Sequence, residues 1–419
     1  MLSFAELRQR EFSRLDRRGI AYLDYTGSAL HAESQLRAHH ELLATELFGN
    51  PHSESAPSRA STAAMEVARA RVLRFLDVGS DTHDVVFTAN TTAAIKLVAE
   101  SYPFTQGSTF ALSADNHNSV NGIREYARRA GARVQYLPLD GELRLQQPEL
   151  TGRGLFAFPA QSNFSGVRHP LSLVAYAKRR GFDVLLDIAS YAPSQPLSLR
   201  DCPADYVALS FYKLFGYPTG LGALIARRDA LAKLARPWFS GGTVAYASIA
   251  ADTHRLRPRH ESFEDGTPNF LGIPALAAGF DLLDQVQLPR ISEHVARLTS
   301  LLLDGLRAMP HVRIYGPADM TARGGTVAFN VPLPYSVVEA RATEANVAVR
   351  GGCFCNPGAS EAAFGLDAND VRNCAGDDFT IERFAACSGK TVGAVRVSIG
   401  LANNEEDIRR ALAVVASFG

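Results

Sequence analysis

An aspartate and a lysine stand where their chemistry could be used. Asp187 closes an apolar segment at 183–187 that is expected to be a strand, and a buried carboxylate is costly unless it is paired. Lys213 follows the next expected strand, 206–210, between aromatic residues and ahead of a glycine-rich turn at 216–222. A lysine that loses water in such surroundings also loses proton affinity, so its amine becomes a nucleophile. The pair indicates covalent chemistry at the ends of two strands.

A helix start that suits an anion is the third feature. Thr91 and Thr92 follow the expected strand at 84–88 and open the expected helix at 91–102. Backbone N–H groups, hydroxyls and the helix dipole at such a start can hold a phosphate. Pyridoxal phosphate requires a lysine that bonds it, a carboxylate that keeps its pyridine nitrogen protonated, and a phosphate cradle. Singly, the aspartate is more often an ion-pair partner, the lysine a solvated residue and the threonines an N-cap, but their joint order favours the cofactor site.

Short apolar segments that alternate with amphipathic ones position these residues. Strands are expected at 84–88, 109–112, 133–137, 155–158, 183–187, 206–210 and 222–226, the last antiparallel, with helices at 91–102 and 120–130. This rhythm predicts an α/β fold with a mostly parallel, seven-stranded sheet that is covered on both faces. Ligands bind at the carboxyl ends of the strands in such sheets, which is where Asp187 and Lys213 fall.

The pattern changes near residue 275. Helical patterns at 273–287 and 291–309 precede short strands at 312–314 and 326–330 and helices at 337–344 and 405–417. We therefore expect two domains, a large cofactor-binding domain at 1–275 and a smaller C-terminal α+β domain at 276–419, with residues 1–20 packing on the small domain.

Composition limits the class of protein. The 419 residues carry 43 Lys and Arg against 43 Asp and Glu, so no basic excess suits nucleic acid or an anionic membrane. The longest apolar runs, such as 221–225, are too short to span a bilayer, and the N-terminus lacks the pattern of a signal peptide. We expect a cytoplasmic protein without nucleic-acid or membrane partners.

The five cysteines have no spacing typical of a disulfide framework or a zinc site. Cys353 and Cys355 stand two apart on a glycine-flanked segment, and Cys374 and Cys387 follow without a paired spacing. In a reducing compartment all five are expected to be free thiols, and no metal is expected. On their own, Cys353 and Cys355 are more simply explained as small packed side chains.

Several motifs together resemble the class V aminotransferase family of fold type I pyridoxal-phosphate enzymes, in its cysteine desulfurase branch. The most specific are SFYKLFG at 210–216 and RGGCFCN at 350–356, and the weaker ones are YLDYTG at 22–27, FGNPHS at 48–53, FTANTTAA at 87–94, SNFSG at 162–166 and VRVSIG at 395–400. The likeness runs from residue 22 to about 411. Within this branch, the sequence resembles most the N-terminal desulfurase domain of the molybdenum-cofactor sulfurases.

The resemblance implies a set of cofactor-binding residues. Lys213 would hold the cofactor and move a proton, Asp187 would pair with the pyridine nitrogen, and His117 would stack on the ring. The remaining expected contacts are Thr91, Thr92, Ser190, Ser210, Tyr212 and Thr267. Tyr212 stands where many relatives have histidine and Ser190 where many have glutamine. Thr267 lies in a loop, 266–269, that together with 241–243 would reach the phosphate of the partner in a homodimer; ordinary turns are the alternative.

The resemblance also implies a substrate site and a reaction. Asn163, Arg350 and Arg396 would bind the amino-acid substrate, whereas sequence alone favours a strand-edge ion pair for Arg396. The expected enzyme is a pyridoxal-phosphate-dependent cysteine desulfurase that moves sulfur from L-cysteine to Cys355 as a persulfide and releases L-alanine. Cys353 is expected to be a packing or resolving thiol.

Two alternatives stay open at this point. A related lyase, epimerase or aminotransferase of specialised metabolism would use Lys213 but not Cys355, and a scaffold that has lost catalysis would need neither. The molybdenum-cofactor sulfurases carry a further C-terminal domain that receives the sulfur, whereas this chain ends at Gly419. A separate sulfur-acceptor protein is therefore the expected partner.

Overall fold

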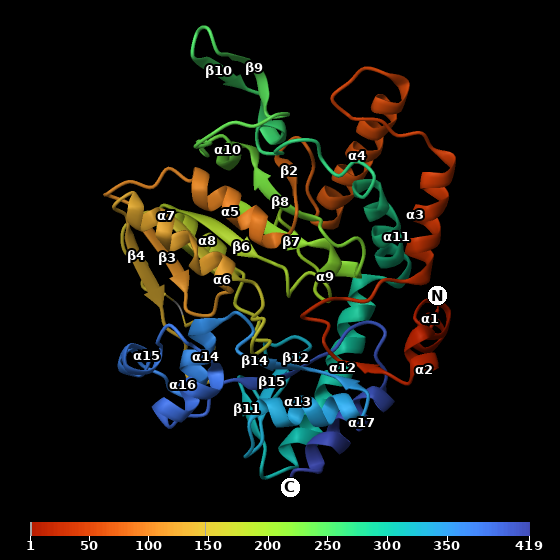
Figure 1. Cartoon of the computed structure of the whole chain (residues 1–419), viewed down its shortest axis with the longest axis vertical. Helices are drawn as coiled ribbons and strands as arrows, with labels where there is room; N and C mark the ends of the chain where they lie inside the picture. The colour runs from red at the N-terminus through yellow and green to blue at the C-terminus, as the bar shows by residue number, and fades with distance from the viewer. Residues whose placement is uncertain (1, 147) are drawn as a thin grey trace.

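A seven-stranded sheet forms the centre of the computed structural model, which describes residues 2–146 and 148–419 (Figure 1). Its strands are β2 (His83–Thr88), β3 (Thr109–Ser113), β4 (Arg133–Leu137), β5 (Gly154–Pro159), β6 (Phe182–Asp187), β7 (Tyr206–Ser210) and β8 (Gly222–Arg227), in the order β2-β8-β7-β6-β5-β3-β4. β8 pairs antiparallel with β2 and β7, and the other pairs are parallel. The predicted α/β fold and its mostly parallel sheet are confirmed.

Both faces of this sheet are buried because helices cover each of them. Neighbouring residues of one strand point to opposite faces, so Val85 and Phe87 belong to one apolar cluster and Val86 to the other. The first cluster includes side chains of α4 (Ala56–Phe75), α8 (Ser172–Arg179) and α11 (Leu276–Val286). The second includes side chains of α5 (Thr91–Ser101), α6 (Asn118–Asn121), α7 (Ile123–Arg129) and α10 (Arg228–Leu231).

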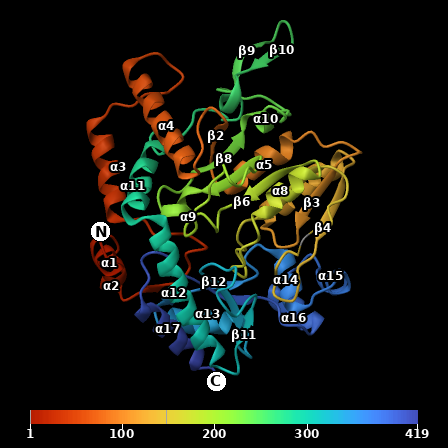
Figure 2. The ribbon, with the colours of Figure 1, turned by 180° about the vertical axis from the view of Figure 1, so that it is seen from behind.

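A four-stranded antiparallel sheet organises the C-terminal part, which lies below the large sheet in Figures 1 and 2. Its order is β11 (Arg313–Tyr315), β12 (Thr326–Asn330), β15 (Ala394–Ser398) and β14 (Arg350–Gly352). The accompanying helices are α12 (Leu288–Arg307), α13 (Tyr335–Glu344), α14 (Pro357–Phe364), α15 (Ala368–Cys374), α16 (Ile381–Ser388) and α17 (Glu405–Ala416). The predicted helices and the strands at 312–314 and 326–330 are present, but β14 and α14–α16 were not anticipated.

The N-terminal segment crosses to these C-terminal helices. In α1 (Phe4–Glu11), the ring of Phe4 stacks on His294 of α12 with centroids 3.8 Å apart. Arg8 pairs with Asp407 of α17 at 2.6 Å. The chain then passes through α2 (Arg14–Arg18), through β1 (Ala21–Tyr22), which pairs with β13 (Val347–Ala348), and through α3 (Glu33–Thr45), which packs on α11.

A hairpin of β9 (Val244–Ser248) and β10 (Thr253–Leu256) projects from the top of the molecule in Figure 1. It carries exposed apolar side chains, Tyr246 and Ile249, and the preceding segment carries exposed Trp238. Short 3₁₀ turns at Arg259–Ser262 and Ile273–Ala275 lead back toward α11. Across the residues that the structure describes, every helix is too short or too polar to cross a membrane.

Two cysteines depart from the expectation of five free thiols. Cys374, at the end of α15, and Cys387, in α16, form a disulfide with their Cα atoms 5.6 Å apart. The expectation is wrong for this pair because α15 and α16 pack against each other, which their separation of 13 residues does not reveal. Cys202, Cys353 and Cys355 are free.

Candidate active site

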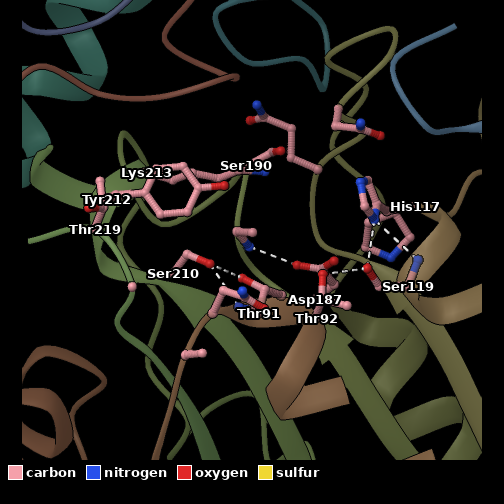
Figure 3. Close-up of a pocket in the computed structure, with 17 residues that line it drawn as sticks. Thr91, Thr92, His117, Ser119, Asp187, Ser190, Ser210, Tyr212, Lys213 and Thr219 are labelled. Carbon is pink, nitrogen blue, oxygen red and sulfur yellow. Dashed lines mark hydrogen bonds between the residues drawn. The ribbon is translucent and has the colours of Figure 1, made fainter. Parts of the chain in front are cut away.

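A cavity of about 340 Å³ lies where strands β5, β6 and β7 end (Figure 3). Nine of the expected site residues line it, namely Thr91, Thr92, His117, Asn163, Asp187, Ser190, Ser210, Tyr212 and Lys213. They come together because parallel strands present their carboxyl ends at the same edge of the sheet. Gln161, Ser119 and Thr219, which sequence reasoning did not single out, also line this cavity.

Lys213 and Asp187 are placed by neighbouring strands. Asp187 is the last residue of β6, and its Oδ1 accepts a hydrogen bond from the backbone N–H of Ala189 at 2.9 Å. Lys213 lies in α9 (Phe211–Phe215), the turn of helix that follows β7. Burial lowers the pKa of Lys213, and the negative charge of Asp187 opposes this shift. The lysine therefore loses its proton more readily than a solvated one, as a nucleophile requires.

The start of α5 forms the expected anion cradle. The side chain of Asn90 caps the helix by accepting from the N–H of Ala93 at 3.0 Å. Ser210 Oγ accepts from the N–H of Thr91 at 2.8 Å and lies 2.6 Å from its hydroxyl oxygen. Gly222 opens β8 directly against Asn90, and a Cβ there would overlap the Asn90 backbone. Hydroxyls and a positive helix end therefore meet at the cavity, as phosphate binding requires.

His117 presents a neutral ring to the cavity. The backbone N–H of Ser119 donates to its Nδ1 at 3.2 Å, so Nδ1 is an acceptor and the ring proton is on Nε2. Burial lowers the pKa of His117, with the charge of Asp187 opposing this shift. Ser119 also links its hydroxyl to that of Thr92 at 2.8 Å, which connects the histidine to the anion cradle (Figure 3).

The donor set of the cavity fits pyridoxal phosphate. Lys213 supplies an amine, Asp187 a carboxylate, and the start of α5 an anion cradle. Gln161 is buried, and its Oε1 has no hydrogen-bond partner among the residues that the structure describes. A buried polar atom is rarely left unpaired, so a ligand that brings a hydroxyl or N–H group fits beside it. Gln161 stands one residue before the SNFSG motif, which is the signal that could have found it.

Arg350 and Arg396 lie together but outside the lining of the cavity, where Asp24 holds both. Asp24 accepts from Nη2 of Arg396 at 2.9 Å and from Nη2 of Arg350 at 2.6 Å. Arg396 is buried, and its Nη1 also donates to the carbonyl oxygen of Asn163 at 2.9 Å. Asn163 therefore connects the cavity to this arginine pair. Asp24 belongs to the YLDYTG motif, yet sequence reasoning gave it no role.

The segment with Cys353 and Cys355 lies against the His117 segment. The carbonyl oxygen of Cys355 accepts from the N–H of Asn118 at 2.8 Å. Cys355 is exposed, whereas Cys353 is half-buried and burial raises the pKa of its thiol. Phe354 and Cys355 both have a φ of 55°, the left-handed region that non-glycine residues rarely adopt.

Thr267 does not join the other expected residues. It lines a neighbouring cavity of about 350 Å³, which shares Ala89 and Gly220 with the first one. The two loops expected to reach a partner do contact each other, since the N–H of Gly266 donates to the carbonyl oxygen of Gly241 at 2.8 Å. The role of Thr267 at a partner's phosphate stays a prediction.

Comparison with known proteins matches the sequence and this geometry to one family. Residues 21–411 match the aminotransferase class-V family, and the chain belongs to it. It is accordingly a pyridoxal-phosphate-dependent enzyme, in agreement with the donor set of the cavity. The sequence is 36% identical over 99% of this chain to the molybdenum cofactor sulfurase of Arabidopsis thaliana and 35% identical over 97% of it to that of Homo sapiens. The chain spans about half of these relatives' length, 58% and 50% respectively.

A solved structure shows the same fold. The apo structure of a cysteine desulfurase from Thermococcus onnurineus NA1 superposes with a TM-score of 0.86 and 26% identity, and the match covers 100% of this chain and 98% of that one.

Proposed function

We propose that the protein is a cysteine desulfurase that passes the sulfur of L-cysteine to Cys355 and releases L-alanine. The observation that carries this proposal is the contact of 2.8 Å between the Asn118 N–H and the Cys355 carbonyl oxygen. It holds the exposed residue Cys355 against the segment of His117, which lines the cavity together with Lys213. The similarity to cysteine desulfurases and molybdenum cofactor sulfurases supports it. An aminotransferase, lyase or epimerase would have no use for a thiol in this place.

The residues of the cavity divide into those that hold the cofactor and those that handle the substrate. Lys213, Asp187 and His117 would hold the ring, and the start of α5 with Ser210 would hold the phosphate. When bound, pyridoxal phosphate supplies an electron sink that weakens the bond between the substrate's Cα and its hydrogen. The lowered pKa of Lys213 lets its Nζ take that proton and return it.

Sulfur transfer then depends on Cys355. Its thiolate attacks the substrate sulfur, so an S–S bond forms while the C–S bond breaks. The carbon keeps the electron pair of the broken bond and gains a proton, which yields alanine. Arg396, which pairs with Asp24 beside Asn163, would bind the substrate carboxylate. Burial lowers the pKa of this arginine, and the negative charge of Asp24 opposes the shift.

The outer sulfur of a persulfide on exposed Cys355 can be passed to another thiol, so we also propose that a separate protein accepts the sulfur. We further propose a homodimer, with a second copy covering exposed Trp238, which lines the same cavity as Thr267, and exposed Tyr246 of the β9–β10 hairpin. Light scattering tests this assembly, and a fully active monomer would contradict it.

Turnover with L-cysteine tests the proposed function. With a thiol reductant present, the wild type should release alanine and sulfide in equal amounts, and Lys213→Ala should release neither. Sulfide with pyruvate and ammonia in place of alanine, or turnover of another amino acid only, would favour the alternative class of reaction.

A further inference from the structure

A buried carboxylate that the proposed reaction does not use lies behind the Cys355 segment. Asp115 is fully buried, two residues before His117. Ser162 Oγ and Asn356 Nδ2 donate to its Oδ1 at 2.8 and 2.6 Å. His169 Nε2 lies 2.8 Å from its Oδ2. Three polar side chains therefore surround this one carboxylate.

The backbone determines which ring nitrogen of His169 carries the proton. The N–H of Leu145 donates to Nδ1 at 3.3 Å, so Nδ1 must be an acceptor. The ring proton is then on Nε2, where it faces Asp115. Both side chains are fully buried, and the contact of His169 fixes the orientation of the carboxylate.

Asn356 connects this carboxylate to the residue before it, Cys355. Its Nδ2 donates to Asp115 and also to Oδ1 of Asn163 at 2.9 Å. Its own Oδ1 accepts from the N–H of Ala359 at 3.2 Å and so caps α14. Because both ends of this buried amide are engaged, the contact with Asp115 sets the path of the chain after Cys355.

Further contacts hold the same segment on residues 114–118. The N–H of Asn118 donates to the Cys355 carbonyl oxygen at 2.8 Å, and Gly358 lies so close to Ala114 that a Cβ would overlap the Ala114 carbonyl oxygen. The left-handed backbone at 354 and 355 is costly for non-glycine residues and persists only where its surroundings hold it. The cluster of Asp115, Ser162, His169 and Asn356 helps to stabilise this backbone conformation.

We propose that Asp115 is a positioning residue, which acts through Asn356 to hold Cys355 beside the cofactor cavity. This inference rests on the proposed desulfurase function. The segment 114–118 then places two groups at once, the ring of His117 and the thiol of Cys355. Loss of the Asp115 contact should therefore impair the step that uses Cys355 while substrate binding is preserved.

The test compares Asp115→Asn, Asn356→Ser and the double variant as holoenzymes. In Asp115→Asn, one carboxylate oxygen becomes an NH₂ group. This group faces either the Nε2 proton of His169 or the NH₂ group of Asn356, so a donor meets a donor in both orientations. Serine at 356 keeps an N-cap for α14 but cannot reach Asp115 as the amide does. This second variant tests the same contact from its other end, and it decides the proposal if Asp115→Asn does not fold.

Hydrogen exchange is the first readout, because it needs no turnover. The amides of Asn118 and Ala359 should exchange roughly tenfold faster in each single variant. Persulfide formation on Cys355 should fall by a similar factor. The KM for cysteine and the cofactor absorbance should stay unchanged in Asp115→Asn, which keeps the bond of Asn356 to Asn163. Since both changes break the contact between Asn356 and Asp115, the double variant should be no worse than the more affected single variant.

Asp205→Asn is the matched control. Asp205 is also a buried carboxylate, and it accepts from the N–H of Val184 at 2.9 Å, but it precedes β7 at the amino end of that strand, away from the site. Exchange at 118 and 359 and persulfide formation should stay at wild-type values in this variant.

Two outcomes separate this proposal from the proposed function. Unchanged exchange in Asn356→Ser, or additive losses in the double variant, would overturn the positioning role of Asp115 even if the wild type forms a persulfide. A wild type that never forms a persulfide would overturn the desulfurase function instead, and the exchange rates would still decide whether Asp115 holds the segment.

Discussion

The carboxylate of Asp24 accepts a hydrogen bond from Nη2 of Arg396 at 2.9 Å, although 372 residues separate the two in the sequence. Arg396 is the residue expected to bind a substrate carboxylate, so Asp24 stands in for one. The side chain of Arg396 is only 3% exposed, where an unpaired guanidinium would be costly. Asp24 therefore keeps Arg396 charged and oriented, and the carboxylate of an incoming substrate must share this arginine with Asp24.

The two arginines on Asp24 should differ in their effect on substrate use. Arg396→Lys should lower kcat/KM for cysteine at least about tenfold, or about 1.4 kcal/mol, because lysine offers a point charge in place of a planar set of donors. Arg350→Lys should cost less, since its side chain is 50% exposed. Steady-state kinetics on holoenzymes with matched cofactor absorbance measures both, and equal losses would contradict the assignment of Arg396.

The close approach of β8 to the anion cradle predicts a cofactor-binding defect. In Gly222→Ala, the added Cβ would overlap the Asn90 backbone, so the turn before Thr91 must shift and the cofactor should dissociate more readily. Gly107→Ala is the control, because nothing lies within 4 Å of a Cβ built at that position. Equilibrium titration with pyridoxal phosphate compares them, and equal affinities would show that the cradle tolerates the shift.

The buried lysine makes stability depend on pH in a definite direction. Burial lowers the pKa of Lys213 below its usual 10.5, so in the protein stripped of cofactor the folded state binds a proton less readily than the unfolded chain does. The penalty is absent above 10.5, grows as the pH falls below it, and becomes constant below the folded-state pKa. Lys213→Met lacks this penalty.

The free energy of unfolding of Lys213→Met should therefore exceed that of the wild type most near neutral pH. Its advantage should shrink as the pH approaches 10.5. Urea unfolding of both proteins across this pH range measures the difference in their free energies of unfolding. The contributions of the other titrating groups are the same in both proteins and cancel in this difference. A difference that does not vary with pH would show that the folded-state pKa of Lys213 is not lowered.

Thiol titration tests the disulfide between Cys374 and Cys387. The denatured, unreduced protein should titrate three thiols, from Cys202, Cys353 and Cys355, and the reduced protein all five of its cysteines. Five thiols before reduction would mean that α15 and α16 pack without the covalent link.

Most strands of the large sheet were predictable because they are buried on both faces and therefore appear as largely apolar segments, as in 183–187 and 206–210. The edge strand β4 is the exception, since most of its residues are exposed or half-buried. β14 was not predictable in this way, since two of its three residues are glycine. The helices α14 to α16 are short, and α15 has no buried residue that would produce an apolar periodicity. Local pattern is weak where burial is slight.

The site residues also fall into those that a local sequence pattern predicts and those that it does not. Asp187, Lys213 and Thr91 follow strands or open a helix, so the sequence alone suggested them. The resemblance was needed for His117 and Asn163, which lie in loops without a periodic signal. Neither approach found the link between Asp24 and the arginines or the cluster around Asp115. These contacts join residues that are 47 to 372 positions apart, as in the bonds of Ser162 to Asp115 and of Arg396 to Asp24, and only the folded chain brings them together.

Sulfur transfer to Cys355 is the central claim, and peptide mass spectrometry tests it most directly. Holoenzyme mixed with L-cysteine without reductant should gain one sulfur atom on the peptide that contains Cys355 and release one alanine for each sulfur gained. Cys353→Ser should retain this adduct and Cys355→Ser should lose it, with cofactor absorbance unchanged in both. An adduct that persists in Cys355→Ser and vanishes in Cys353→Ser, or the absence of any adduct while alanine is released, would contradict the account.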